Sequence, residues 1–178
     1  NIYLFPGNAG SEDFQKCKRV SIDYLETNKL VEKLISLDID LVLIGPETPL
    51  ASGLGDILRS KNFSVFGPGS DGAKLESSKA WAKKFMKEAQ IPTADSWEIN
   101  SLKQAKEIIF SNPKQLVVKA DGLASGKGVF ICETKEDTFQ ITEEILNGKF
   151  GDAGKVVVLE EKIEGPEVSV FAITDGNK

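Results

Sequence analysis

The 178-residue sequence contains no histidine, only two cysteines and no long apolar run. Without histidine, the chain lacks the side chain that most often serves as a general base or a metal ligand. Cys17 and Cys132 lie far apart without C-x-x-C spacing, which favours two free thiols in a reducing cytoplasm over a disulfide. No apolar stretch approaches the ~20 residues of a membrane span, and no signal-peptide pattern opens the chain.

The charge balance excludes two classes of partner. The net charge is −5, with 40% hydrophobic and 28% charged residues, which is ordinary for a globular protein. Nucleic acids and anionic membranes do not attract an acidic chain, so we predict neither as a partner. The length allows one large domain or two small ones.

The first 68 residues alternate strand and helix patterns. Residues 2–5 and 41–44 read as strands, the second apolar enough to be a parallel strand covered on both faces. Residues 11–27 show no clear period. One helix is expected from Asn28, capped by Thr27 or Asn28. A second follows residue 49, and a short strand follows at 63–66. Their inward positions are Leu30, Val31, Leu34 and Ile35, then Leu50, Leu54, Ile57 and Leu58. These units predict an α/β fold with an open, Rossmann-like parallel sheet.

Two loops follow the carboxyl ends of the predicted strands, where open α/β sheets bind ligands. The first contains Asn8, Ala9 and Gly10, and the second contains Gly45, Pro46 and Glu47. Glu47 is a lone charge between two prolines and is placed to face a crevice. A solvated loop carboxylate is an equally good interpretation.

The Gly/Pro-rich residues 67–70 indicate a linker. A helix then carries Trp81, Phe85 and Ala89 on one stripe, which is typical of core packing. Ser77 or Ser78 is a good N-cap, but Lys79 in the first turn opposes the helix dipole. A lysine there is favourable if it and the free backbone N–H groups face an anion. The alternative is a solvated lysine.

The remaining pattern is typical of an α+β module. Ser101 and Gln104 form a capping box that opens one helix, and another helix begins at Thr134. Strands are predicted at 116–120, 129–132, 156–159 and 168–174, with a turn at 175–178.

The most distinctive stretch is the loop between the first two of these strands. It holds Gly122, Ser125, Gly126, Lys127 and Gly128. Glycine can turn backbone N–H groups toward a ligand and lysine adds positive charge, a combination that suits a polyphosphate. The loop is no Walker A motif, because only three residues separate its first two glycines and a strand follows it. We therefore predict a hairpin flap over phosphates. An ordinary long hairpin loop is the alternative.

Four charged residues elsewhere fit a nucleotide site. Lys119 lies in an otherwise apolar strand and requires solvent or a partner charge. Glu160 and Glu161 follow an apolar strand, where a carboxylate can accept from an amino group and the following backbone can read an adenine edge. Glu167 can accept from ribose hydroxyls. Surface carboxylates are the alternative interpretation.

Taken in order, these motifs resemble the phosphoribosylamine–glycine ligase (glycinamide ribonucleotide synthetase) family, ATP-grasp enzymes of purine synthesis. The matching segments are residues 6–10, 45–53, 66–68 with 75–79, 117–129 and 160–169. Residues 11–27 match poorly, and Pro166 replaces a usual acidic residue.

The resemblance implies a role for each matching residue. Lys79 and Lys119 would bind the ATP phosphates and take part in catalysis, under the flap of residues 122–128. Glu160 would accept from the adenine amino group, and Glu167 would hold the ribose. The adenine hinge would be Glu161, Lys162 and Ile163, and the phosphoribosylamine loops would be Asn8, Ala9 and Gly10 with Gly45, Pro46 and Glu47.

The resemblance also implies a reaction and a domain layout. ATP, with Mg²⁺ or Mn²⁺, would activate glycine as glycyl phosphate, and the amine of 5-phosphoribosylamine would displace phosphate. We expect a Rossmann-like N-terminal domain at 1–68 and part of an ATP-grasp domain at 69–178, with a smaller subdomain at 92–165. The family's first strand would precede Asn1 and its metal ligands would follow Lys178. The fragment alone should therefore be inactive.

Other interpretations remain open from the sequence. A different ATP-grasp carboxylate–amine ligase or a biotin-dependent carboxylase would share the lysines and the flap. A non-catalytic adenine-nucleotide-binding module would need no metal ligands. The parent could also be fused to other purine-pathway domains.

Overall fold

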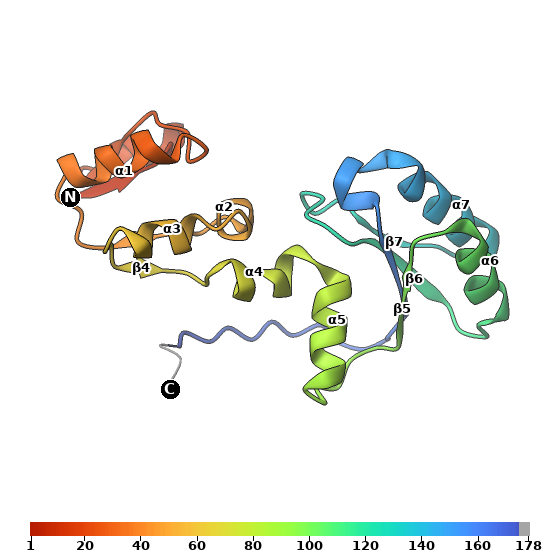
Figure 1. Cartoon of the computed structure of the whole chain (residues 1–178). Helices are drawn as coiled ribbons and strands as arrows, with labels where there is room; N and C mark the ends of the chain where they lie inside the picture. Colours follow the sequence, from red (N-terminus) through yellow and green to blue (C-terminus); the bar gives the residue numbers. More distant parts are fainter. Residues whose placement is uncertain (175–178) are drawn as a thin grey trace.

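The computed structural model describes residues 1–174. In chain order the elements are β1 (Ile2–Leu4), η1 (Ala9–Asp13), β2 (Cys17–Arg19), α1 (Thr27–Ser36), β3 (Val42–Leu43), α2 (Glu47–Ala51), α3 (Leu54–Ser60), β4 (Val65–Phe66), α4 (Ser70–Ser77), α5 (Lys79–Glu88), β5 (Ser96–Ile99), α6 (Leu102–Ser111), β6 (Leu116–Ala120), β7 (Val129–Ile131), α7 (Lys135–Glu144), η2 (Ile145–Lys149), η3 (Gly151–Gly154) and β8 (Val157–Glu161). Figure 1 shows two lobes joined by α4 and α5. Within the described part, every helix is too short or too polar to cross a membrane.

The N-terminal lobe contains the predicted parallel strands. β1 pairs with β2 and β3 with β4, both in parallel, and α1 and α3 bury leucines beside them. Within residues 1–174 the strands form two separate pairs and not one open sheet. The buried core consists of Leu30, Leu34, Ile44, Leu50, Leu54, Leu58 and Ala73.

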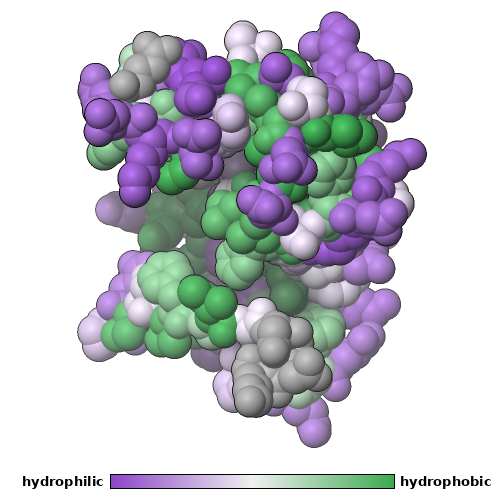
Figure 2. Space-filling model, turned by 90° about the vertical axis from the view of Figure 1, so that its left-hand side faces the viewer, coloured by the Kyte–Doolittle hydropathy of each residue, from purple (hydrophilic) through white to green (hydrophobic). Residues whose placement is uncertain are grey.

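Several details of this lobe differ from the prediction. Residues 11–27 contain β2, whose short length left no readable period. The strand at 41–44 is covered on one face only, because Leu41 and Leu43 are 58% and 67% exposed. Ile35, expected inward, is 65% exposed. In Figure 2 apolar side chains gather in the middle of the face that this lobe presents.

The helix boundaries in this lobe also differ. Thr27 is already helical and its hydroxyl donates to the Tyr24 carbonyl, so neither it nor Asn28 caps α1. The single helix expected through Leu50 and Leu58 is two helices, because Gly53 takes a left-handed φ of 83° between them. The linker ends at Gly69, since α4 begins at Ser70.

The helix α5 begins as predicted but packs differently. Ser78 caps it by accepting from the Trp81 N–H. The stripe of Trp81, Phe85 and Ala89 is not core, however, because Phe85 is 40% exposed and Ala89 is exposed. The buried side chain of α5 is Ala82, while Trp81 and Phe85 stack on each other at 5.3 Å.

The C-terminal lobe is a four-stranded antiparallel sheet in the order β5-β8-β6-β7. The predicted hairpin is confirmed as β6 and β7, and Thr134 caps α7 as predicted. Ser101 caps α6, although Gln104 accepts from the Asn100 N–H and not from Ser101 itself. Helices α6 and α7 cover one sheet face, and the core there is Ile99, Ala105, Ile109, Leu116, Val118, Ala120, Cys132, Ile145, Val157 and Leu159.

The last segment departs most from the prediction. No strand forms at 168–174, and Val168 and Phe171 are 78% and 92% exposed. A strand needs a hydrogen-bonded neighbour, and this segment pairs with no strand in residues 1–174. The predicted turn at 175–178 lies outside the described residues.

Candidate functional site

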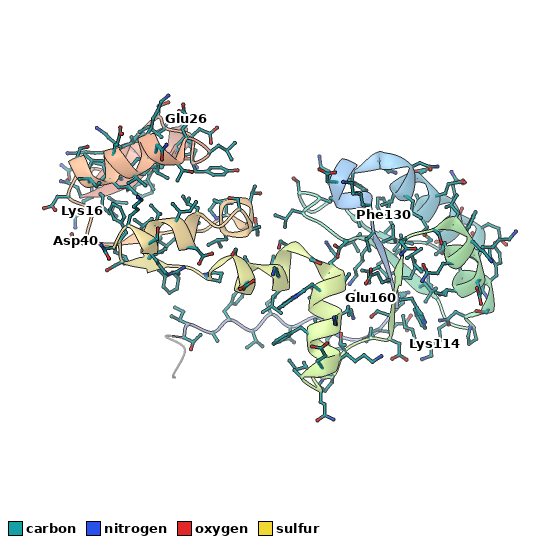
Figure 3. All side chains as sticks on the ribbon, in the orientation of Figure 1. Lys16, Glu26, Asp40, Lys114, Phe130 and Glu160 are labelled. Carbon is teal, nitrogen blue, oxygen red and sulfur yellow. The ribbon has the colours of Figure 1, made fainter. Side chains whose placement is uncertain are left out.

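The face of the C-terminal sheet opposite α6 and α7, which α5 approaches, carries a cluster of charges. Strand alternation places Val117, Lys119 and Glu160 on the face opposite α6 and α7, with Val117 directly across from Glu160. The Lys119 Nζ lies 2.9 Å from Glu160 Oε2, which answers the predicted need of this lysine for a partner charge. Figure 3 shows Glu160 where α5 meets the strands.

A second lysine contacts the same carboxylate oxygen. Lys83 on α5 places its Nζ 3.1 Å from Glu160 Oε2, and the two side chains are 12% and 10% exposed. The same ammonium donates to the Thr93 hydroxyl at 2.8 Å and to the Ala94 carbonyl at 3.2 Å. Two cations therefore compensate one buried carboxylate, as burial of a charge requires.

The N-terminus of α5 is already occupied by an anion of the protein itself. Asp121, the first residue after β6, accepts from the Ala80 N–H at 2.7 Å and from the Ser78 hydroxyl at 3.1 Å. Its backbone carbonyl accepts from the Lys79 N–H at 3.2 Å. The N–H groups at this helix start do face an anion, but the anion is the Asp121 carboxylate of the protein, and Asp121 and Ser78 leave these N–H groups no donor for a ligand.

The Lys79 ammonium itself reaches the glycine loop. Its Nζ donates to the carbonyls of Asp121 at 3.3 Å and Gly122 at 3.2 Å. Burial lowers the pKa of the Lys79 ammonium from its ordinary value, and Lys119 acts in the same direction, against Asp121, Glu76 and Glu160. Lys79 thus lies within the same electrostatic cluster as Lys119 and Glu160.

The glycine loop at 121–128 is tied down at its base and open at its tip. The Gly122 N–H donates to the Ala153 carbonyl at 3.1 Å, and the Ala120 N–H donates to the Gly128 carbonyl at 2.8 Å. Within residues 1–174, the N–H groups of Ser125 and Gly126 at the tip have no hydrogen-bond partner. Both residues have positive φ, at 50° and 75°. An unpaired run of N–H groups is what an oxyanion site requires.

The acidic pair lies inside β8 and not after it, because the pairing of β6 with β8 continues to Leu116 and Glu161. Alternation then points Glu161 to the other face, where it pairs with Lys114. The Lys162 N–H donates to the Gln115 carbonyl at 2.9 Å. In the described part of the chain, the backbone of Ile163 is unpaired and therefore available to a ligand.

The other predicted residues do not join this cluster. Glu167 is exposed beyond β8. Asn8 uses its side chain to cap η1, accepting from the Ser11 N–H at 3.1 Å, so Ala9 and Gly10 are helical and not loop. Glu47 is also helical, since α2 begins there with Pro46 as its N-cap and Gly45 just before it. Figure 1 shows the hairpin loop pointing toward α2, above α4.

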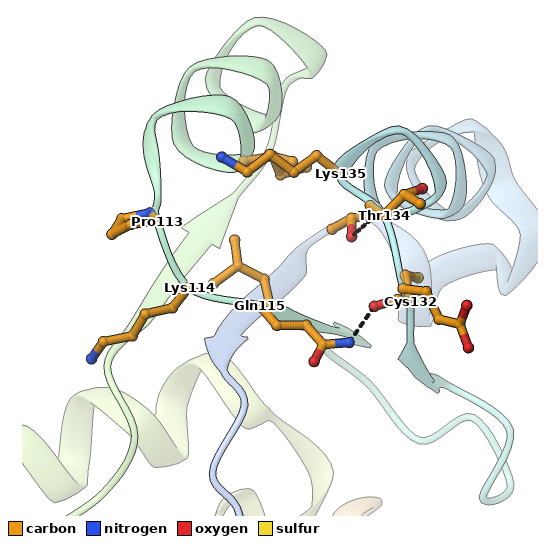
Figure 4. Close-up of a pocket in the computed structure, with 10 residues that line it drawn as sticks. Pro113, Lys114, Gln115, Cys132, Thr134 and Lys135 are labelled. Atoms are coloured by element: carbon orange, nitrogen blue, oxygen red, sulfur yellow. Dashed lines mark hydrogen bonds between the residues drawn. The ribbon is translucent and has the colours of Figure 1, made fainter.

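Two surface pockets lie near the sheet. One of about 330 Å³ opens between α6 and α7, and Figure 4 shows Gln115 donating there to the Cys132 carbonyl. None of the predicted site residues lines it. The other, of about 570 Å³, lies along α5 and is lined by Lys83, Val158 and Glu98 among others. Because Glu98 and Val158 pair across the sheet, this pocket borders the charged face.

Sequence reasoning missed two residues of the cluster. Lys83 is one of several lysines in an amphipathic helix, so its residue type alone does not single it out. Its four-residue spacing from Lys79, which places both lysines on one helix face, was the one available signal. Asp121 sat beside the first loop glycine, where a turn aspartate is unremarkable.

These groups fit an adenine nucleotide. Lysine ammoniums and unpaired loop N–H groups suit phosphates, and the unpaired Ile163 backbone suits a base edge. They do not fit a magnesium ion by themselves, since no group of three potential metal ligands occurs in residues 1–174.

Two family models match the chain end to end. The model "Phosphoribosylglycinamide synthetase, N domain" matches residues 1–76, and "Phosphoribosylglycinamide synthetase, ATP-grasp (A) domain" matches residues 77–178. A phosphoribosylamine–glycine ligase from Nostoc sp. is 44% identical over 175 residues, which cover 98% of this chain and 41% of that protein. The trifunctional purine biosynthetic protein adenosine-3 of Drosophila melanogaster is 43% identical, over 98% of this chain and 13% of that protein.

A solved structure gives the same result. The phosphoribosylamine–glycine ligase of Thermotoga maritima superposes with a TM-score of 0.70 at 29% identity, over 93% of this chain and 38% of that one. This chain therefore spans about two fifths of the length of the single-function ligases it matches.

Proposed function

The chain belongs to the phosphoribosylglycinamide synthetase family, and on this premise we propose that it holds ATP for the joining of glycine to 5-phosphoribosylamine. The product is glycinamide ribonucleotide, with ADP and phosphate released. The observation that carries the proposal is the meeting of Lys79, Lys119 and Glu160 beside the glycine loop. Lys119 of β6 and Glu160 of β8 share one face of the sheet, and Lys79 comes from α5.

The chemistry proposed for the parent protein has two steps. The glycine carboxylate attacks the γ-phosphorus of ATP, which gives glycyl phosphate and ADP. The amine of 5-phosphoribosylamine then attacks the acyl carbon and phosphate leaves, forming the amide. Neither step needs a nucleophilic side chain, so the absence of histidine is compatible with it.

The residues of this chain bind and orient. Lys79 and Lys119 neutralise phosphate charge, and the loop with Gly122, Ser125, Gly126, Lys127 and Gly128 covers the phosphates with its N–H groups. Glu160 accepts from the adenine amino group, while the backbone at 161–163 reads the base edge. Glu167 holds the ribose. Mg²⁺ or Mn²⁺, which supplies charge neutralisation, takes its ligands from outside the described residues.

The N-terminal loops are proposed to select the amine substrate. These are Asn8, Ala9 and Gly10, followed by Gly45, Pro46 and Glu47. The first turn of α2 presents the Glu47 carboxylate beside the helix N-terminus. The domain bounds 1–68 and 69–178, with a subdomain at 92–165, are part of this proposal. Two separate buried cores support a division into two lobes, although Ala73 of α4 packs in the N-terminal core.

The wider setting is also proposed. Two free cysteines favour a reducing cytoplasm. Fusion to other purine-pathway activities, as in the trifunctional Drosophila relative, is one form the parent could take.

Nucleotide binding by residues 1–178 tests the part of the proposal that this chain carries. We expect weak binding of MgADP, detected by chemical-shift titration, and loss of binding in Lys119→Met. A matched control is Lys61→Met, whose lysine follows α3 in the other lobe. No turnover is expected from residues 1–178 alone. Full glycinamide ribonucleotide synthesis by this fragment would contradict the proposal that it binds the nucleotide while the rest of the parent protein completes catalysis.

A further inference from the structure

The proposed function uses one of the two lysines that contact Glu160, and the other has no assigned role. We propose that Lys83 is a positioning residue of the nucleotide site. It acts as a fixed counter-ion that keeps Glu160 oriented toward the base when Lys119 moves to the phosphates. This inference rests on the proposed function.

The contacts separate a fixed lysine from a movable one. The Lys83 ammonium donates hydrogen bonds to the Thr93 hydroxyl at 2.8 Å and the Ala94 carbonyl at 3.2 Å, and it forms an ion pair with Glu160 Oε2 at 3.1 Å. Lys119 makes one such contact in the described part of the chain, with Glu160, and its side chain is 27% exposed against 12% for Lys83. Lys119 therefore has donors and solvent access for a ligand, while Lys83 has neither.

The burial of Glu160 makes the fixed counter-ion necessary. Its side chain is 10% exposed, so a departure of Lys119 would leave a buried charge unless another cation stayed. If a neutral side chain replaces Lys83, Lys119 has to stay on Glu160 as its counter-ion. The ATP phosphates then lose Lys119 as a partner. The effect of Lys83 on nucleotide affinity is thus transmitted through Glu160 and Lys119.

The same geometry gives a specificity. The ion-pair contacts of both lysines are to Oε2, which leaves Oε1 as the oxygen we propose for the base. A carboxylate oxygen accepts from the adenine amino group, whereas guanine presents a carbonyl oxygen at the corresponding position. Two acceptors facing each other are unfavourable, so a Glu160 fixed by Lys83 disfavours guanine.

The test is a titration of residues 1–178 with ADP and with GDP. We expect Lys83→Met to bind ADP about tenfold more weakly or worse, with a much smaller change for GDP, because removing one partner of a buried ion pair exposes the other. Lys84→Met is the matched control. Its side chain is 76% exposed and 4.0 Å from Glu88, and both affinities should stay within about twofold.

Two further variants separate positioning from mere folding. Lys83→Arg keeps the charge and should keep the ADP preference even if the melting temperature falls. In a Glu160→Gln background, Lys83→Met should cause no further loss of the preference, since its target is already neutral.

The outcomes are distinct. ADP preference in the wild type that is unchanged in Lys83→Met overturns the role of Lys83 and leaves the proposed function standing. Equal losses of the ADP preference in Lys83→Met and Lys83→Arg also overturn the role of Lys83, because the positive charge at this position would then have no effect. A wild type that binds neither nucleotide at millimolar concentration overturns both proposals.

Discussion

Replacement of Asp121 by alanine is the change that best tests the link between the glycine loop and α5. The carboxylate accepts from the Ala80 N–H at 2.7 Å and from the Ser78 hydroxyl at 3.1 Å, and it lies at the positive end of the helix dipole. Loss of a helix cap costs about 1 kcal/mol, and loss of the charge–dipole interaction about 0.3–1 kcal/mol. Asp121→Ala should therefore destabilise the C-terminal lobe by about 2 kcal/mol.

The assay is urea unfolding followed by tryptophan fluorescence. Trp81 lies on α5 and Trp97 on β5, so both tryptophans report on this lobe. Asp121→Asn should destabilise the lobe by about half as much as Asp121→Ala, because the asparagine amide keeps one acceptor oxygen but not the charge.

Asp71→Ala is the matched control. Asp71 lies in the first turn of α4, 93% exposed, and keeps only the dipole and a surface ion pair with Lys74. Its cost should be about 0.5 kcal/mol. If Asp121→Ala and Asp71→Ala cost the same, Asp121 is not a structural tie and the account of the α5 N-terminus is wrong.

Three further changes have definite expected outcomes. Cys132 is 8% exposed and burial raises the pKa of its thiol, so in the native wild type it should react with a disulfide reagent far more slowly than Cys17, and equal rates would contradict this packing. Gly122→Ala places a Cβ 2.8 Å from Ala153 and should destabilise by about 1–3 kcal/mol in urea melts, whereas Gly165→Ala, with no neighbour within 4 Å, should be nearly neutral. Because the pKa of Lys79 is lowered in the folded state, the folded state loses this proton at a lower pH than the unfolded state does. The stability of the wild type should therefore rise relative to that of Lys79→Met as the pH rises toward 10.5. A stability difference that stays constant between pH 7 and 10.5 would contradict the burial of this lysine.

Local patterns predicted the elements that depend on local chemistry. The caps at Ser78, Ser101 and Thr134 follow from side chains that reach their own helix N-terminus. The β6–β7 hairpin was readable because apolar runs flank a glycine-rich loop. The resemblance then assigned the nucleotide residues, which no local pattern could connect.

Long-range contacts were not predictable in the same way. A helical period marked Trp81 and Phe85 as core, but what covers a face is decided by distant chain, and Ala82 is buried instead. An apolar run at 168–174 has strand propensity, yet a strand exists only with a partner. The role of Asp121 arises from a contact across more than 40 residues to Ser78 and Ala80.

The central claim is that the cluster of Lys79, Lys119 and Glu160 holds ATP for a glycine-dependent ligase. The most direct measurement is ADP release by the parent protein with glycine and 5-phosphoribosylamine supplied separately and together. We predict rapid release of ADP only with both substrates, one ADP for each glycinamide ribonucleotide, and loss of this release in Lys119→Met. Release that proceeds without 5-phosphoribosylamine at the same rate, or with bicarbonate in place of glycine, would contradict it.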